Sequence, residues 1–237
     1  MLNKENFPIA TFALTAIILI CFLIPQTSVI YENLSFIPSS ISLVRIYTFV
    51  TYTFLHKDWG HIIGNLILLL VAGWVLEEEV GKKRFLLIFF TSGFIAAVFE
   101  VLSRVMLNFT MDAPFVGASG AVAGLLAAAS LMKPTYKIPS IFVILLILPL
   151  LLLVFDLPIF TDNMLKVSIM VLSGVVGVIL WFLMQEVPLF LVVPMFLLYW
   201  FISVVVGFNV GVSDMGHIGG ALGGMLIFFI LPKEKET

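Results

Sequence analysis

Four side chains in this sequence have the types and spacing needed for nucleophilic catalysis. The chain has three histidines, which are His56, His61 and His217, and Ser119 lies in the glycine-rich stretch GASG (117–120). A serine hydroxyl is a poor nucleophile until a base takes its proton, and an imidazole is the usual base. The residues therefore indicate Ser119 and His217 as a candidate nucleophile and general base.

A second pair of polar residues could stabilise the charge that such an attack creates. His61 and Asn65 are four positions apart, so they share one face of a helix. Both side chains can donate hydrogen bonds to an oxyanion on the attacked carbonyl. We therefore expect His61 and Asn65 to lie beside Ser119.

Small residues recur at every fourth position in the two segments that carry Ser119 and His217. They are Gly120, Gly124 and Ala128 in one segment and Gly216, Gly220 and Gly224 in the other. Rows of this kind let two membrane helices approach closely. If the rows face each other, Ser119 and His217 begin their helices at matching depth.

The composition indicates which elements must position these residues. The chain of 237 residues is 62% hydrophobic and 11% charged, with a mean hydropathy of +1.20, whereas soluble domains are nearer half apolar and a quarter charged. Backbone in lipid must satisfy its own hydrogen bonds, so the apolar runs should be helices. We predict an all-α polytopic membrane protein. The net charge of −2 gives no indication of nucleic-acid binding.

The apolar runs predict about eight membrane spans, most of them long enough for a hydrocarbon core that takes roughly 17–25 residues per helix. They cover 7–25, 61–79, 85–106, 117–133, 138–155, 166–185, 188–208 and 215–231. The segment 26–59 is too polar to span and is expected to lie partly in the interface. For Ser119 and His217 to face the same leaflet, an odd number of spans must separate them, and three candidates do.

The basic residues predict the orientation, because cytoplasmic loops are enriched in Lys and Arg. With the N-terminus inside, the inner positions are Lys4, Lys82, Lys83, Arg84, Lys133, Lys137, Lys233 and Lys235, and the outer ones are Arg45, Lys57, Arg104 and Lys166. This eight-to-four split favours a multi-pass protein of the cell (cytoplasmic) membrane with both termini cytoplasmic. Glu100 and Arg104 are four apart and can pair on one helical face, most simply as a structural ion pair.

Two other classes of function fit part of the pattern. Three histidines could in principle hold zinc, although His56 and His61 are five apart and the chain has no HExxH motif. A transporter would be expected to carry broken helices at corresponding positions of two repeated halves, and no internal repeat is evident. Each glycine row, taken alone, is also compatible with simple helix packing.

Four stretches resemble the rhomboid family of intramembrane serine proteases. They are FLHKDWGHIIGN (54–65), LEEEVGKKRF (76–85), GASGAVAG (117–124) and GHIGGALGG (216–224). The resemblance implies a single domain over 1–237, with a six-helix core and an extra transmembrane hairpin at about 138–185. It casts Ser119 and His217 as a catalytic dyad.

The resemblance also assigns supporting roles. It implies an oxyanion hole made by His61, Asn65 and the backbone N–H of Ser119. His56, Gly117, Gly220 and Gly224 would support the loop and the packing, and Glu77 and Gly81 match a structural turn. No cofactor, metal or nucleotide is expected. One departure is Ala123, where the family often has a bulky residue against the catalytic histidine.

The resemblance implies cleavage of transmembrane protein substrates near the outer membrane face. The partners would then be those substrates and the lipid bilayer. A proteolytically inactive rhomboid-like protein that binds or guides transmembrane clients is the alternative, and the presence of both Ser119 and His217 favours the protease.

Overall fold

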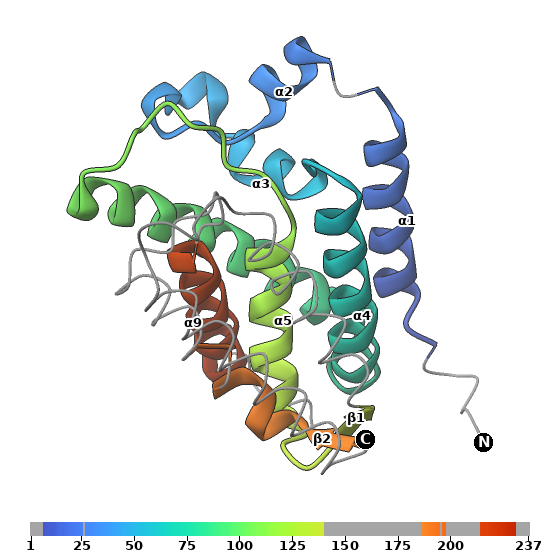
Figure 1. The fold of residues 1–237 in the computed structure, drawn as a ribbon. Helices are drawn as coiled ribbons and strands as arrows, with labels where there is room; N and C mark the ends of the chain where they lie inside the picture. Colours follow the sequence, from blue (N-terminus) through green and yellow to red (C-terminus); the bar gives the residue numbers. More distant parts are fainter. Residues whose placement is uncertain (1–6, 26, 140–185, 195, 198–213, 231–237) are drawn as a thin grey trace, which may run out of the picture.

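The computed structural model describes residues 7–25, 27–139, 186–194, 196–197 and 214–230. The chain is mostly helical (Figure 1). The longer helices are α1 (Ile9–Leu23), α2 (Ser28–Leu34), α4 (Trp59–Leu107), α5 (Ser119–Met132) and α9 (Asp214–Ile230). The short elements are η2 (Pro38–Ser40), η3 (Leu43–Arg45), α3 (Thr48–Thr51), η4 (Tyr52–Phe54), β1 (Lys137–Pro139) and β2 (Glu186–Pro188).

The long element α4 is two helices that meet at Gly81. Gly81 has φ 73° and ψ 161°, which is not helical, and glycine adopts a positive φ without steric cost. The ring of Phe85 lies 3.2 Å from where a Cβ on Gly73 would stand. In an unbroken helix these two residues would be about 18 Å apart. The break therefore turns the second half of α4 back beside the first.

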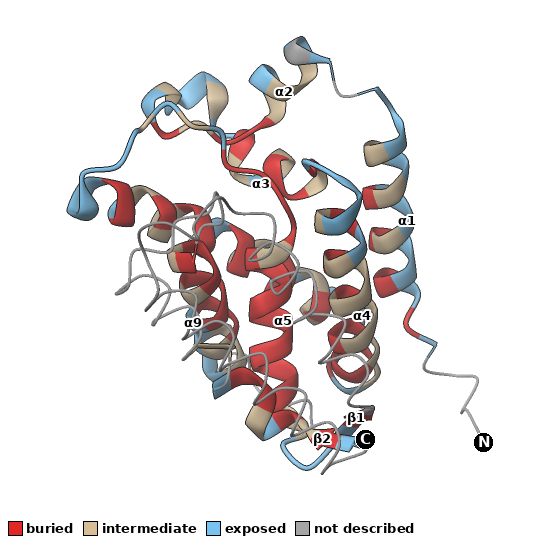
Figure 2. Cartoon of the chain, viewed as in Figure 1, coloured by how far each residue is buried: buried red, intermediate tan, exposed pale blue. Residues whose placement is uncertain are grey.

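Helix α5 forms the centre of the bundle and packs against both α4 and α9. Every residue from Gly120 to Ser130 is buried, as Figure 2 shows. Most of these residues are glycine or alanine, and short side chains allow neighbouring backbones to come close. The composition of α5 thus explains why it can be surrounded on several sides.

The glycine rows of α5 and α9 face each other at backbone contact distance. A Cβ on Gly220 would overlap the carbonyl oxygen of Gly120, and one on Gly224 would overlap that of Gly124. From the first contact to the second, the residue number increases by four on both helices, so the two helices run parallel. Their N-terminal ends, with Ser119 on one and His217 on the other, therefore lie at the same end of the bundle, which we call the Ser119 end.

Helix α1 depends on a carboxylate from α4 for its first turn. Pro8 precedes α1 and supplies no side-chain cap, and the first turn has no acidic residue. The buried Glu77 accepts hydrogen bonds from the N–H groups of Ala10 and Thr11 at 2.8 and 2.7 Å. It also accepts one from the Thr11 hydroxyl at 2.8 Å. An anionic acceptor at a helix N-terminus is favourable, so Glu77 joins α1 to α4.

Two short strands correct the expectation of a wholly helical chain. Strands β1 and β2 pair antiparallel, with Lys137 opposite Pro188 and Pro139 opposite Glu186. Ile138 and Pro139, expected to open a helical run, are therefore extended instead. Proline lacks the N–H that a helix interior needs, which is a physical reason for this difference. The pairing places the two ends of the segment 140–185 side by side at the Lys133 end of α5.

Among the described residues, α4 is the helix with the length and hydropathy needed to cross a membrane. Shorter apolar helices are α1, α5 and α9. The expected spans at 138–155, 166–185 and 188–208 lie largely or wholly outside the described residues. The count of about eight spans therefore stays a prediction.

The contact between α5 and α9 makes a prediction about stability. Gly220→Ala places a methyl group on the Gly120 backbone, which cannot move aside cheaply, and such overpacking costs about 1–3 kcal/mol. We expect a lower thermal unfolding midpoint for this variant in detergent. Gly64→Ala is the matched control, because a Cβ on Gly64 meets nothing within 4 Å. Equal stability of the two variants would contradict the close approach.

Candidate active site

Ser119 and His217 meet at the Ser119 end of the bundle. Ser119 is the first residue of α5, and His217 lies in the first turn of α9. The distance from Ser119 Oγ to His217 Nε2 is 2.8 Å, which is a good hydrogen-bond distance for a hydroxyl and an imidazole. His217 is buried, with 8% of its surface exposed. The fold thus brings together two residues that lie 98 positions apart.

Gly117 brings the chain into α5 in a conformation that favours glycine. Its φ is +117°, and a Cβ would stand 2.6 Å from both Cε1 and Nε2 of His61. The imidazole of His61 therefore lies directly against the backbone that precedes Ser119. The amide nitrogen of Asn65 is 3.8 Å from the same point. His61 and Asn65 thus border the peptide that leads to Ser119.

The first two turns of α4 fix the positions of His61 and Asn65. Asp58 caps this helix by accepting a hydrogen bond from the N–H of His61 at 2.8 Å, as aspartate commonly does. The Asn65 amide donates to the carbonyl of His61 at 3.0 Å. A carboxamide has two N–H donors, so this bond uses one of them. The buried Asn65 is held on the side of α4 that faces the loop before α5.

His56 lies beside His61, against the same loop. It is 1% exposed, and its ring centroid is 4.9 Å from that of His61. Burial, together with the nearby His61, lowers the pKa of His56 to about 3, so the ring is neutral at neutral pH. Its Nε2 accepts a long hydrogen bond of 3.5 Å from the N–H of Ala118. His56 therefore contacts the peptide unit next to Ser119.

Two further attachments of this loop were not expected from the sequence. The N–H of Gly117 donates to the carbonyl of Tyr52 at 3.0 Å, and the buried Tyr52 hydroxyl donates to the carbonyl of Gly93 at 2.7 Å. Phe36 and Phe115 exchange both of their backbone hydrogen bonds. The bonds of Gly117 with Tyr52 and of Phe115 with Phe36 join backbone groups of distant segments, and residue spacing carries no signal for them.

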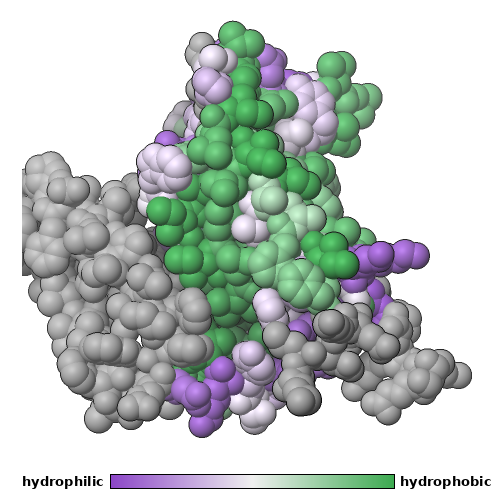
Figure 3. Space-filling view, turned by 90° about the vertical axis from the view of Figure 1, so that its right-hand side faces the viewer, coloured by the Kyte–Doolittle hydropathy of each residue, from purple (hydrophilic) through white to green (hydrophobic). Residues whose placement is uncertain are grey.

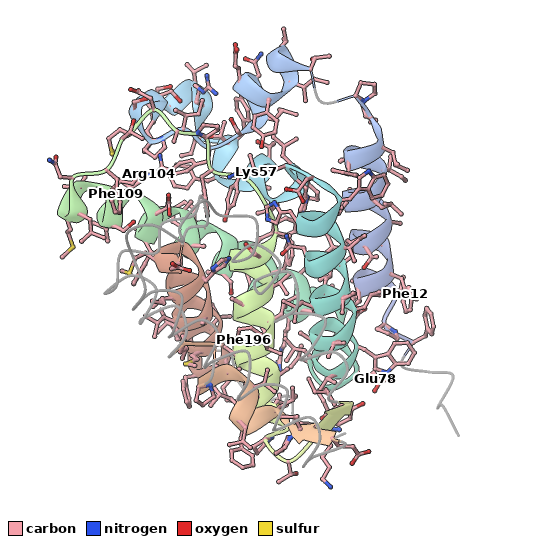
Figure 4. The ribbon with its side chains drawn as sticks, viewed as in Figure 1. Phe12, Lys57, Glu78, Arg104, Phe109 and Phe196 are labelled. Carbon is pink, nitrogen blue, oxygen red and sulfur yellow. The ribbon has the colours of Figure 1, made fainter. Side chains whose placement is uncertain are left out.

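The ion pair expected between Glu100 and Arg104 is confirmed. Arg104 Nε donates to Glu100 Oε1 at 2.7 Å, and both side chains are buried. The Nη1 group of Arg104 also donates to the carbonyls of Thr110 and Ala113 at 3.0 and 2.7 Å. Figure 4 shows Arg104 on α4, close to the loop that leads into α5. The sequence predicted the pair but not its contacts with this loop.

Comparisons with known proteins show the family to which the chain belongs. The Rhomboid domain family model matches residues 44–180, more than half of the chain. That range contains His56, His61, Asn65 and Ser119, and it ends before His217. The contact of His217 with Ser119 comes from the structure alone, because the family match does not reach His217.

Two curated proteins are similar to parts of the chain. "Rhomboid-like protein 11, chloroplastic" of Arabidopsis thaliana is 39% identical over 92 residues, which are 38% of this chain and 30% of that protein. "Putative rhomboid protease YdcA" of Bacillus subtilis (strain 168) is 28% identical over 135 residues, which are 52% of this chain and 65% of that protein. The chain thus spans less than two thirds of each relative. With the family model matching more than half of its length, this chain belongs to the rhomboid family of membrane proteins.

Proposed function

We propose that this protein is an intramembrane serine protease that hydrolyses peptide bonds of transmembrane substrates through a Ser119–His217 dyad. The observation that carries the proposal is the 2.8 Å distance between Ser119 Oγ and His217 Nε2. A base at hydrogen-bond distance from a hydroxyl is the arrangement that activates a serine nucleophile. No cofactor enters this chemistry.

The dyad supports two proton transfers by one imidazole. His217 Nε2 accepts the proton of Ser119 Oγ while the oxygen attacks the substrate carbonyl. The same nitrogen then donates that proton to the amine that leaves, which produces an acyl-enzyme. A water molecule hydrolyses the ester after His217 removes its proton, and Ser119 recovers its hydrogen.

The surroundings of Ser119 suit the oxyanion of this reaction. As the first residue of α5, Ser119 has a backbone N–H that no bond within the helix uses. The N-terminal end of a helix also favours negative charge. His61 and Asn65 border the peptide before Ser119 and supply further donors. We assign the oxyanion hole to these three groups.

The surface supports contact with a lipid bilayer. Figure 3 shows that hydrophobic side chains gather over the described part of the face that carries α1. Ile9, Ile17, Ile20 and Leu23 of α1 are between 46% and 64% exposed. Exposed apolar surface on this scale is typical of a membrane-facing or partner-facing surface. The proposed substrates are transmembrane proteins that reach the dyad from within the bilayer.

We further propose about eight spans, with both termini cytoplasmic in the cell membrane. The parallel course of α5 and α9 supports an odd number of crossings between them. The pairing of β1 with β2 supports an even number within 140–185, because the chain enters and leaves that segment at one place. Ser119 would then lie near the outer face and Lys133 near the inner one.

Labelling with a fluorophosphonate probe tests the dyad. The purified wild-type protein should react at Ser119, and Ser119→Ala should abolish labelling. His217→Ala should reduce labelling and cleavage of a transmembrane substrate by several orders of magnitude, because the hydroxyl loses its base. Equal labelling of wild type and Ser119→Ala would sink the assignment, and an unreactive wild type would favour the client-binding alternative.

Substitution of Gly117 tests the oxyanion hole. Gly117→Ala places a methyl group 2.6 Å from the His61 ring and should displace that donor. Loss of one such donor lowers kcat by about 100-fold or more. The measurement is substrate cleavage per folded molecule, and Gly64→Ala on the nearby turn of α4 serves as the control. Unchanged cleavage by Gly117→Ala would argue against a role for His61.

Accessible single cysteines test the orientation. In a Cys21→Ser background, Asp112→Cys at the Ser119 end should react with a membrane-impermeant maleimide added to intact cells. Lys83→Cys, beside the turn at Gly81, should react only after permeabilisation. The reverse pattern would overturn the proposed orientation of the dyad toward the outer face.

A further inference from the structure

The loop before the nucleophile is held by a buried arginine of α4. Arg104 is 8% exposed, and its guanidinium contacts three acceptors, which are Glu100 Oε1 and the carbonyls of Thr110 and Ala113. Two of these acceptors belong to the loop 108–118, which connects α4 to α5. The side chain thus reaches beyond its own helix into the segment that leads to Ser119.

The ion pair between Glu100 and Arg104 does not by itself require the contacts of Arg104 with the loop carbonyls. Glu100 and Arg104 are four apart on one helix, and pairs at this spacing also form when both side chains are exposed to solvent. Burial of both groups removes their hydration, which is costly unless further hydrogen bonds compensate. The two loop carbonyls supply that compensation. The planar fork of arginine can serve several acceptors at once, whereas the ammonium of lysine is a single compact charge.

The attachments of the loop continue from Ala113 to Ser119. Arg104 holds the carbonyl of Ala113, and Phe115 exchanges two backbone hydrogen bonds with Phe36. The N–H groups of Gly117 and Ala118 then donate to Tyr52 and His56. No stretch longer than one residue between Ala113 and Ser119 is without such a contact, so Arg104 is the first of a series of attachments that together set the path of the loop to Ser119.

We propose that Arg104, held by Glu100, is a positioning residue that sets the loop 108–118 and thereby the placement of the Ser119 hydroxyl and backbone N–H. This proposal rests on the proteolytic function proposed above. Arg104 touches no reacting atom. Its effect on the reaction is geometric, because misplacement of a catalytic group by about 1 Å can cost on the order of 100-fold in rate.

The test compares substitutions of Arg104 with a matched change in another ion pair. Arg104→Gln removes the charge and most of the donors, and Arg104→Lys keeps the charge but loses the planar fork. Lys133→Gln breaks the ion pair between Lys133 and Glu79 at the opposite end of the bundle. For each purified variant, kcat and KM for a transmembrane substrate are measured per folded molecule, together with the unfolding midpoint.

We expect Arg104→Gln to lower kcat by at least ten-fold with KM changed by less than two-fold. Arg104→Lys should fall between this variant and wild type, and Lys133→Gln should keep the wild-type kcat. A kcat within two-fold of wild type for folded Arg104→Gln would overturn the proposal. If Arg104→Gln does not fold, the kcat of Arg104→Lys decides instead. A kcat at least two-fold below wild type supports the proposal, and a smaller loss overturns it.

Hydrogen exchange of the loop tests the role of Arg104 independently of the proposed proteolytic function. Peptides covering 108–118 should exchange faster in Arg104→Lys than in wild type, while peptides from α9 should not change. This readout needs no substrate, so it holds even if the wild-type protein fails to react with a fluorophosphonate. Unchanged exchange in 108–118 would show that Arg104 does not set the loop and would overturn the proposal.

Discussion

The backbone contact between α5 and α9 is the constraint on which the site depends. Side chains ordinarily keep helix axes 8–10 Å apart, and a Cβ on either Gly220 or Gly224 would already overlap the α5 backbone. Only glycine at these positions allows the two helices to touch. Because the helices run parallel and start at the same end, their first turns meet, and a short serine side chain can reach an imidazole. The contact between Ser119 and His217 is therefore a consequence of the packing between these helices.

Ser119, the proposed nucleophile, is fixed by several elements at once. Helix α5 carries Ser119, α9 carries its partner, and the first two turns of α4 carry His61 and Asn65. The loop before α5 has no regular secondary structure and takes its shape from external contacts with Arg104, Phe36 and Tyr52. Preorganised donors of this kind stabilise developing charge without having to reorganise during the reaction. The site thus combines a rigid helical frame with a loop that is held from both sides.

The sequence predicted the parts of the site that follow from residue type and spacing. Serine, histidine and asparagine are chemically distinctive, and the four-residue spacing of small residues indicated a close helix pair. The rhomboid family was also predicted, and it is confirmed. Spacing could not predict the contacts that join distant backbone segments, such as Gly117 with Tyr52, because any residue supplies an N–H and a carbonyl.

Two local structures also differ from what hydropathy alone indicates. The apolar character of Ile138 favoured a helix, whereas the residue pairs with Val187 in a short antiparallel ladder. The segment 26–59 was expected to be a loop at the interface, and it contains several short helices, including α2 and α3. Hydropathy distinguishes apolar from polar segments, but it does not resolve hydrogen bonding over three or four residues.

The contact of Glu77 with α1 has a consequence for biosynthesis. The carboxylate that accepts from Thr11 lies 66 positions further along the chain, so α1 leaves the ribosome well before its acceptor does. Until then the amides of its first turn must be satisfied by water or lipid headgroups. Helix α1 is thus completed only when the first half of α4 arrives beside it. The contact that caps α1 therefore forms later than the synthesis of α1 itself.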